Sequence, residues 1–284
     1  MLVIGRRSQV GPALDRAGAG ARFVLDVRDR AALDINDGAS VRSTVAGATA
    51  VVNAAAITAV DRLESTRDEA FVTNAEAAGI LARTCAEACA FLVQLSTDNV
   101  FDGANGQPWT EDDPVAPLND YGASKAQGER LVRATLPGHA IFRTSWVYYG
   151  EGRNFLTAML GLVHRTEIEV VGDQIGAPTP AADVAAAILK VLGRALRDDG
   201  ISGTWHYAAD GAVSWTGFAE AILSGLGKGP KVVPVATETR GVLARRPRNS
   251  SLDCGRIKWD FAAPRRLWRD GLASVLSDNL EGAT

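Results

Sequence analysis

The chain has 284 residues, of which 46% are hydrophobic and 22% are charged. Its formal net charge of −3 is spread over both signs, so no basic surface for nucleic acid is expected. No run of about 18 apolar residues is present to cross a membrane, and the opening MLVIG reads as a strand that leaves no room for a signal peptide. We therefore expect a cytoplasmic protein without nucleic-acid or membrane partners.

The first half of the chain predicts alternating strands and helices. The expected elements are strands at LVIG, RFVLDV, ATAVVNAAA, FLVQLST and HAIFRTSWVY, and helices over about 12–16, 67–90 and 121–134. Alternation with continuous apolar strands is typical of a parallel sheet with helices on both faces. The fold class is thus α/β, a doubly wound Rossmann-type sheet.

Beyond residue 148 the alternation weakens. Helices are expected over 154–165, 182–196 and 268–279, a strand at IEVVGD, a strand at GTWHYAA, and a helix at SWTGFAEAIL with Ser214 as its N-cap. The stretch 229–260 reads as irregular. These patterns predict a nucleotide-binding domain over 1–148, with 178–200 packing back on it, and a smaller substrate-binding domain from 149–177 and 201–284.

The first turn, GRRSQVG, has the small residues that let a backbone approach a pyrophosphate. Gly5 and Gly11 fit this role, and Gln9 and Val10 lie between them. Ser8 stands where a central glycine is expected, so a plain strand-turn-helix connection is the alternative.

Asp26 is expected near the end of the second strand, where an acidic residue binds the adenosine ribose and favours NAD. Arg6, Arg7 and Arg28 are close in sequence and suit a 2′-phosphate, which favours NADP. The choice between NADH and NADPH therefore stays open.

Two further segments are candidates for cofactor contact. Asp34 and Ile35 border the adenine in this interpretation, although Asp34 is equally suited to cap a helix. The small residues Ala54, Ala55 and Ala56 allow a cofactor to lie against the backbone.

Tyr121 and Lys125 lie four apart in DYGASKAQGE, and positions four apart share one face of a helix. A nearby ammonium lowers the pKa of a phenol from its ordinary value near about 10, so we expect Lys125 to tune Tyr121 for proton transfer to a carbonyl oxygen. Thr97 ends a buried strand, where its hydroxyl can hold the reacting oxygen. The alternative is an exposed helical pair without chemistry.

Five blocks in order, NAAAITAVDRLES, STDNVFDG, PLNDYGASKAQGE, FRTSWVY and DQIGAPT, resemble the dTDP-4-dehydrorhamnose reductase family of extended short-chain dehydrogenase/reductases. The resemblance implies hydride transfer from NADPH or NADH to the C4 ketone of a dTDP-linked 4-keto-6-deoxyhexose. It implies catalytic roles for Thr97, Tyr121 and Lys125, with the last two also binding the cofactor. It also implies that the substrate is contacted by Thr58, Val60, Asn99, Trp146 and Arg246. Arg246 would bind the diphosphate of the substrate; the alternative is that it forms a structural salt bridge.

The chain departs from the family pattern in three places. Asn99 replaces the tyrosine usual after STD, which puts the exact sugar in doubt and raises a different dTDP-deoxysugar as an alternative. Ser8 puts cofactor affinity in doubt, and a non-catalytic regulatory subunit is a second alternative. Ala13 and Ala182 stand near the places of metal-linked carboxylates, so no metal is expected. A monomer and a homodimer both fit the sequence.

Overall fold

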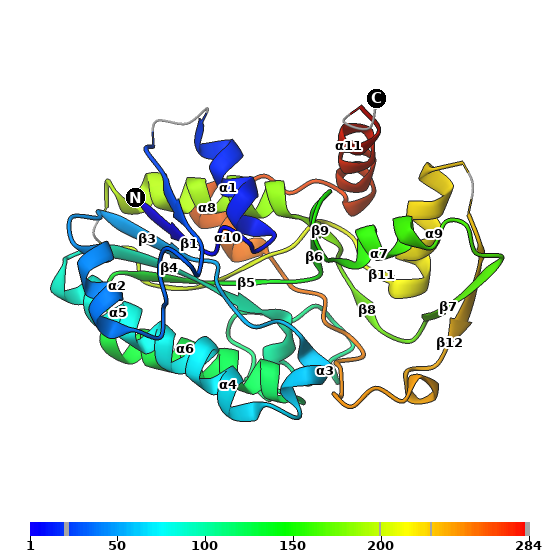
Figure 1. The fold of residues 1–284 in the computed structure, drawn as a ribbon, viewed down its shortest axis with the longest axis horizontal. Coiled ribbons are helices and arrows are strands. Elements are labelled where there is room, and N and C mark those ends of the chain that lie inside the picture. The colour runs from blue at the N-terminus through cyan, green and yellow to red at the C-terminus, as the bar shows by residue number, and fades with distance from the viewer. Residues whose placement is uncertain (20–22, 199, 228, 282–284) are drawn as a thin grey trace.

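A six-stranded parallel sheet forms the centre of the molecule, in the order β2–β1–β3–β4–β5–β10 (Figure 1). The computed structural model describes residues 1–19, 23–198, 200–227 and 229–281. The strands are β1 (Leu2–Ile4), β2 (Asp26–Arg28), β3 (Ala50–Asn53), β4 (Phe91–Thr97), β5 (His139–Thr144) and β10 (Gly203–Tyr207). Parallel order places the carboxyl ends of these strands at one edge of the sheet.

Helices cover both faces of the sheet because both faces of its strands are apolar. One layer contains α1 (Val10–Ala19), α8 (Ala181–Ala195) and α10 (Gly255–Phe261), and the other contains α2 (Gly38–Val45), α5 (Ala77–Glu87) and α6 (Asp120–Thr135) (Figure 1). Val3 packs into the first layer, whereas its neighbours Leu2 and Ile4 pack into the second. This two-residue alternation is what a strand imposes.

Three short helical segments precede α5. They are α3 (Val60–Leu63), α4 (Arg67–Phe71) and a π-helical turn at Val72–Glu76. The π turn carries Asn74, whose side chain bonds to Ile57 and to Ser124 of α6. It therefore ties the loop after β3 to the helix that bears Tyr121.

A smaller part with its own core lies beside the sheet (Figure 1). Its elements are α7 (Phe155–Gly161), α9 (Trp215–Gly225) and α11 (Trp268–Glu281), the parallel pair β7 (Glu167–Val171) with β12 (Lys231–Val235), and the short pairs β8 (Ile175–Gly176) with β11 (Val213–Ser214) and β6 (Val147–Tyr148) with β9 (Thr179–Pro180). Ser214 caps α9 by accepting from the backbone of Gly217, as predicted. Over the ranges described, no helix has the length and apolar character that a membrane crossing requires.

Four expectations need correction. Strand β2 begins at Asp26 instead of ending near it, because Asp26 pairs with Leu2; Arg22, at the start of the expected strand, lies outside the described residues. The stretch expected to be irregular contains β12, a 3₁₀ turn (Thr237–Arg240) and α10. Strand β10, assigned to the C-terminal domain, is the edge strand of the central sheet. Asp37, not Asp34, caps α2.

Candidate active site

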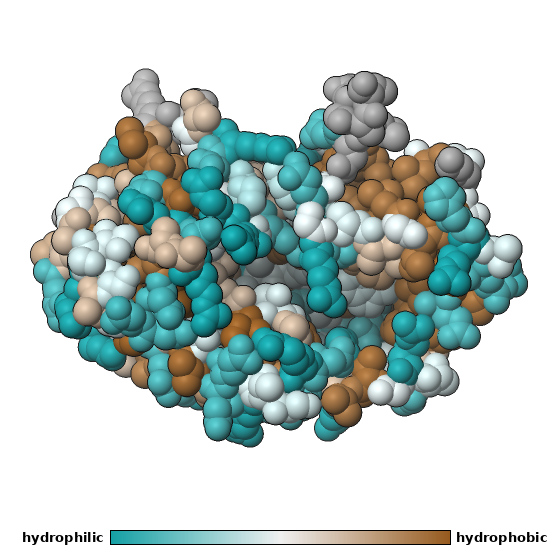
Figure 2. Space-filling view, in the orientation of Figure 1, coloured by the Kyte–Doolittle hydropathy of each residue, from teal (hydrophilic) through white to brown (hydrophobic). Residues whose placement is uncertain are grey.

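A cavity of about 660 Å³ lies at the carboxyl ends of the strands, between the sheet and the smaller part. Figure 2 shows this face of the molecule hollowed between the two parts, with hydrophilic residues around the rim. Most of the predicted site residues line the cavity: Gly5, Ser8, Gln9, Val10, Asp34, Ile35, Ala54, Ala55, Ala56, Thr58, Val60, Thr97, Asn99, Tyr121, Lys125, Trp146 and Arg246. Gly11, Asp26 and Arg28 do not.

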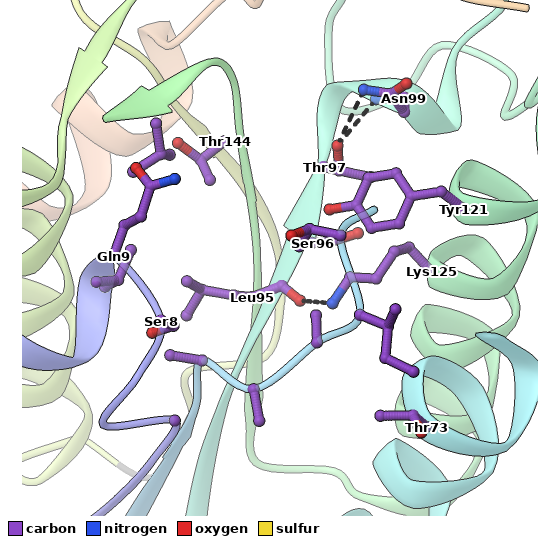
Figure 3. A pocket seen from close by; sticks show the side chains of 18 of the residues that line it. Ser8, Gln9, Thr73, Leu95, Ser96, Thr97, Asn99, Tyr121, Lys125 and Thr144 are labelled. Carbon is purple, nitrogen blue, oxygen red and sulfur yellow. Dashed lines mark hydrogen bonds between the residues drawn. The ribbon is translucent and has the colours of Figure 1, made fainter. Parts of the chain in front are cut away.

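The start of α6 carries Tyr121 and Lys125 into the cavity (Figure 3). Asn119 caps this helix by accepting from the backbone N–H of Gly122. Gly122 allows a close approach to the turn after β4, because a Cβ there would lie 2.1 Å from the carbonyl oxygen of Asn99. A larger residue would push the helix, and Tyr121 with it, away from Thr97.

Lys125 is almost fully buried, and its Nζ donates to the carbonyl oxygen of Leu95 over 2.6 Å (Figure 3). Burial lowers the pKa of Lys125 to about 8, and the negative charge of Glu129 partly opposes this. The ammonium is therefore charged at neutral pH but close to titration.

Tyr121 does not have the lowered pKa that the sequence suggested. Burial of the phenol raises its pKa to about 12, a hydrogen bond with Thr97 lowers it, and the charge of Asp98 raises it further. The Nζ of Lys125 donates to the carbonyl oxygen of Leu95 and has no hydrogen bond to the phenol among the described contacts. Tyr121 consequently keeps its proton at neutral pH, as a proton donor must.

Thr97 lies beside Tyr121 at the end of β4 (Figure 3). Its hydroxyl donates to Oδ1 of Asp98 over 2.9 Å and accepts from the backbone N–H of Asn99. Asp98 is buried and also accepts from the hydroxyl of Ser145; burial raises the pKa of its carboxyl. The Asn99 amide donates to Oδ1 of Asp98 over 3.0 Å and to the hydroxyl of Thr97 over 3.4 Å, so it is held against that hydroxyl.

The turn between β1 and α1 forms the opposite wall of the cavity. Gly5 has φ +112°, and a Cβ on it would lie 2.8 Å from the backbone of Ala54 and Ala55. Gly11 lies under the turn, where a Cβ would lie 2.2 Å from the carbonyl oxygen of Gly5. Ser8 faces the cavity and its hydroxyl accepts from the N–H of Gly11, so it takes over a capping role. Ser8, Gln9 and Val10 at the start of α1 line the cavity, so the positive end of the helix dipole lies beside it.

Of the residues expected at the adenosine end of the cofactor site, Arg7, Asp34 and Ile35 line the cavity, whereas Asp26 and Arg28 do not. Asp26 and Arg28 form a bidentate ion pair with each other outside the cavity. Asp29, Arg7 and Arg30 line the cavity instead, and Asp29 lies 3.7 Å from Arg7. The reason is that β2 ends at Arg28, so Asp29 and not Asp26 follows the strand.

Three buried polar atoms that face the cavity find no partner among the described residues: Oε1 of Gln9, Oδ1 of Asn36 and Oγ1 of Thr144. Figure 3 shows Gln9 and Thr144 on the side of the cavity opposite Tyr121. Buried polar groups are normally hydrogen-bonded, so this cavity suits a polar ligand. Together with the start of α1, which lines the cavity, and the small residues 54–56, these polar groups fit a nicotinamide dinucleotide.

Two tryptophans line the cavity on the side of the smaller part. Trp146 stacks on Trp215 with ring centroids 3.5 Å apart and planes within 6°. Trp146 has φ +45°, a left-handed backbone that is rare for a bulky residue. A Cβ on Gly176 would lie 2.4 Å from the Trp146 ring, so this glycine gives the indole its room.

Arg246 reaches the cavity from the 241–250 segment and pairs with Asp61 of α3, at 2.6 Å and 3.1 Å. The hydrogen bonds from Arg246 hold the pKa of Asp61 below its usual range. A second, more apolar cavity of about 300 Å³ adjoins here and shares Gln174, Trp215 and Arg246 with the first.

Sequence reasoning missed several lining residues: Asp29, Arg30, Asn36, Thr73, Arg153, Gln174, Trp215 and Ser250. Gln174 belongs to the DQIGAPT block, so the sequence motif could have been used to predict it as a site residue. Trp215 offered no local signal, because its contact with Trp146 joins segments far apart in the chain. In the portion of the chain described here, no cluster of three metal-binding side chains is found.

The fold and the site define an NAD(P)H-dependent oxidoreductase. The family model for the RmlD substrate binding domain matches residues 1–280. The dTDP-4-dehydrorhamnose reductases of Burkholderia thailandensis and Escherichia coli are 39% and 36% identical, over 99% and 98% of this chain and 99% and 97% of theirs.

Solved structures agree with this. A dTDP-4-dehydrorhamnose reductase of Clostridium acetobutylicum matches with a TM-score of 0.93 and 35% identity, over 99% of both chains. The Bacillus anthracis enzyme in complex with NADP matches with a TM-score of 0.92 and 34% identity, over 98% of both chains. The chain belongs to the dTDP-4-dehydrorhamnose reductase family.

Proposed function

We propose that this protein reduces the C4 ketone of dTDP-4-dehydro-L-rhamnose to give dTDP-L-rhamnose, with NADPH or NADH as the reductant. The observation that carries the proposal is the convergence of Thr97, Tyr121 and Lys125 on one wall of a cavity whose other wall suits a dinucleotide. The presence of all three residues in one cavity disfavours a non-catalytic regulatory subunit.

The cofactor is held by the turn between Gly5 and Val10, by residues 54–56 and by Lys125, with Asp29 and Arg7 at its adenosine end. When bound, its reduced nicotinamide supplies a hydride for C4 of the sugar. The cavity places this chemistry at the carboxyl ends of the strands, where ligands of such sheets bind.

Tyr121 gives its proton to the C4 oxygen, so the ketone becomes a secondary alcohol. Its raised pKa ensures that the proton is present at neutral pH. The Lys125 ammonium offsets the negative charge that the transfer leaves on the phenol. Thr97 supplies a second hydroxyl beside the same oxygen.

The nucleotide part of the substrate extends toward the smaller part of the molecule, which serves as the substrate-binding domain. Trp146 offers an aromatic face to the sugar, and the adjoining apolar cavity suits a nucleobase. Arg246 is placed for the diphosphate: Asp61 occupies Nη1 and Nη2, whereas Nε has no bond within the described portion of the chain. The edge formed by Nε and Nη2 is therefore free to bind a phosphate group.

The decisive assay follows NADPH oxidation by the purified protein with dTDP-4-dehydro-L-rhamnose and with a panel of other dTDP-4-keto-6-deoxysugars. Turnover of the rhamnose precursor above that of the others is expected. Asn99 motivates the second candidate, a reductase for another dTDP-deoxysugar, because the amide bound to Thr97 replaces an aromatic contact. Preference for another sugar in the panel selects this candidate, and no turnover of any member refutes both.

We infer that the enzyme works in the cytoplasm. Its working unit is a monomer or a homodimer. Light scattering of the purified protein distinguishes the two.

A further inference from the structure

A buried ionic network lies directly behind the catalytic residues and has no part in the chemistry proposed above. Glu129 is one helical turn beyond Lys125 on α6, and its side chain is 1% exposed. The guanidinium of Arg143 on β5 donates to both of its carboxylate oxygens, over 2.9 Å from Nε and 2.7 Å from Nη2. Arg133, which is partly exposed, adds a third bond at 2.9 Å.

The remaining contact of Glu129 connects this network to β4. The hydroxyl of Ser96 donates to Oε1 of Glu129 over 2.6 Å. Ser96 lies between two residues of the site: Leu95, whose carbonyl oxygen accepts from Lys125, and Thr97, whose hydroxyl adjoins Tyr121. Side chains of neighbouring strand residues point to opposite faces, so the tether turns the Ser96 hydroxyl toward Glu129 of α6 and leaves the Thr97 side chain on the other face of β4. Both residues line the cavity.

We propose that Glu129 is a positioning residue for the reductase reaction: through Ser96 it fixes the end of β4 against α6, so that Leu95 holds Lys125 and Thr97 meets Tyr121. This rests on the proposed function above. The residues Tyr121, Lys125 and Glu129 lie at four-residue intervals on one helix face, so the proton donor, its cation and the anchor form one rigid unit.

Other groups around Glu129 hold the Glu129–Arg143 ion pair in place. His206 on β10 lies 3.3 Å from Nη1 of Arg143, and its second ring nitrogen lies 3.1 Å from the carbonyl oxygen of Trp109. Burial lowers the pKa of His206 to about 3, so the ring is neutral and accepts from Arg143. Burial alone would raise the pKa of Glu129, but Arg143 and Ser96 outweigh it and keep the carboxylate ionised.

The ionised carboxylate also acts on Lys125, because its charge raises the pKa of the ammonium against the effect of burial. Removal of that charge should therefore lower the pKa of Lys125. The basic limb of the pH profile should then move to lower pH, a change that loss of packing alone would not cause.

The test compares Ser96→Ala and Glu129→Gln with the wild type in the NADPH oxidation assay, over a range of pH. We expect Ser96→Ala to lower kcat about tenfold, as loss of a charge-assisted hydrogen bond would, with an unchanged basic limb. Glu129→Gln should lower kcat similarly and move the basic limb of kcat/KM to lower pH. The Kd for NADPH, measured by nicotinamide fluorescence, should change by a smaller factor than kcat in both, because the other residues that hold the cofactor are kept.

Tyr207→Phe is the matched control, since it removes a buried hydroxyl that donates to the carbonyl oxygen of Pro264 outside the cavity. Its kcat and pH profile should equal those of the wild type. Wild-type kcat in Ser96→Ala overturns the proposal, whether or not Glu129→Gln folds. An inactive wild type refutes the proposed function alone, whereas an active wild type with unaffected variants refutes only this inference.

Discussion

The two walls of the active-site cavity are built on different principles. The proposed catalytic wall, formed by β4 and α6, places Thr97 and Lys125 in the interior. Thr97 is fixed by its hydrogen bond to Asp98, and Lys125 by its hydrogen bond to the carbonyl oxygen of Leu95. The adenosine wall, formed by the turn 5–11 and the segment 26–36, presents exposed charges; the side chain of Arg7 is 86% exposed. Buried groups that are hydrogen-bonded are costly to rearrange, whereas exposed ion pairs contribute little to stability.

The difference explains where each wall tolerates change. Substitutions on the catalytic wall should alter the rate of the chemical step. Those on the adenosine wall should alter cofactor preference or stability by smaller amounts. Four experiments test this contrast.

Removal of the Tyr121 hydroxyl should have the largest effect. Tyr121→Phe is expected to lower kcat by roughly 10²–10⁴-fold, because a general acid contributes this much, while the Kd for NADPH changes little. Steady-state assays and fluorescence titration measure the two. Tyr149→Phe, which removes a hydroxyl from outside the cavity, is the control. Near-normal turnover in Tyr121→Phe would show that Tyr121 is not the general acid.

The pH profile of the wild type tests the cation on the same wall. The pKa of Lys125 is lowered to about 8, so its charge is present below that pH and is lost as pH rises through it. We expect kcat/KM for reduction to fall about tenfold per pH unit above this value, as loss of one proton requires. A profile that stays flat well beyond pH 8 would show that the Lys125 charge is not needed.

On the adenosine wall, Asp29 should set the preference between cofactors. Asp29→Asn is expected to raise the KM for NADH roughly 3–10-fold, the cost of weakening a hydrogen bond to a charged group, with a smaller change for NADPH. Asp26→Asn is the matched control, since Asp26 pairs with Arg28 outside the cavity. The reverse pattern, in which only Asp26→Asn shifts the preference, would restore the original assignment.

The smallest effect is expected at Ser8. Its hydroxyl accepts from the N–H of Gly11 in the first turn of α1, so Ser8→Ala should lower the free energy of unfolding by about 1 kcal/mol and Ser8→Gly by only a few tenths. Urea denaturation measures both. An equal loss in the two variants would show that the serine caps nothing. Cofactor affinity should change little in Ser8→Gly, because the backbone of the turn is kept.

The local sequence pattern was sufficient to predict the helix and the strand that form the proposed catalytic wall. The four-residue spacing of Tyr121 and Lys125 fixes their common helix face, and the buried run FLVQLST fixes the strand that ends at Thr97. The alternation of strands and helices likewise predicted the parallel sheet. The pKa of Tyr121 was predicted in the wrong direction, because burial is a property of the folded site and not of the spacing.

The sequence alone predicted the α/β class, the order of most elements and the shared helix face of Tyr121 and Lys125, because these depend on patterns within single helices and strands. The catalytic roles of Thr97, Tyr121 and Lys125 remain a prediction. Only the tertiary structure decided which charges border the cofactor site, since β2 takes its register from its pairing with β1. It also decided the stack of Trp146 on Trp215, the pairing of Asp61 with Arg246 and the tether from Glu129 to Ser96. Those contacts join segments that are distant in the chain, so no local sequence pattern encodes them.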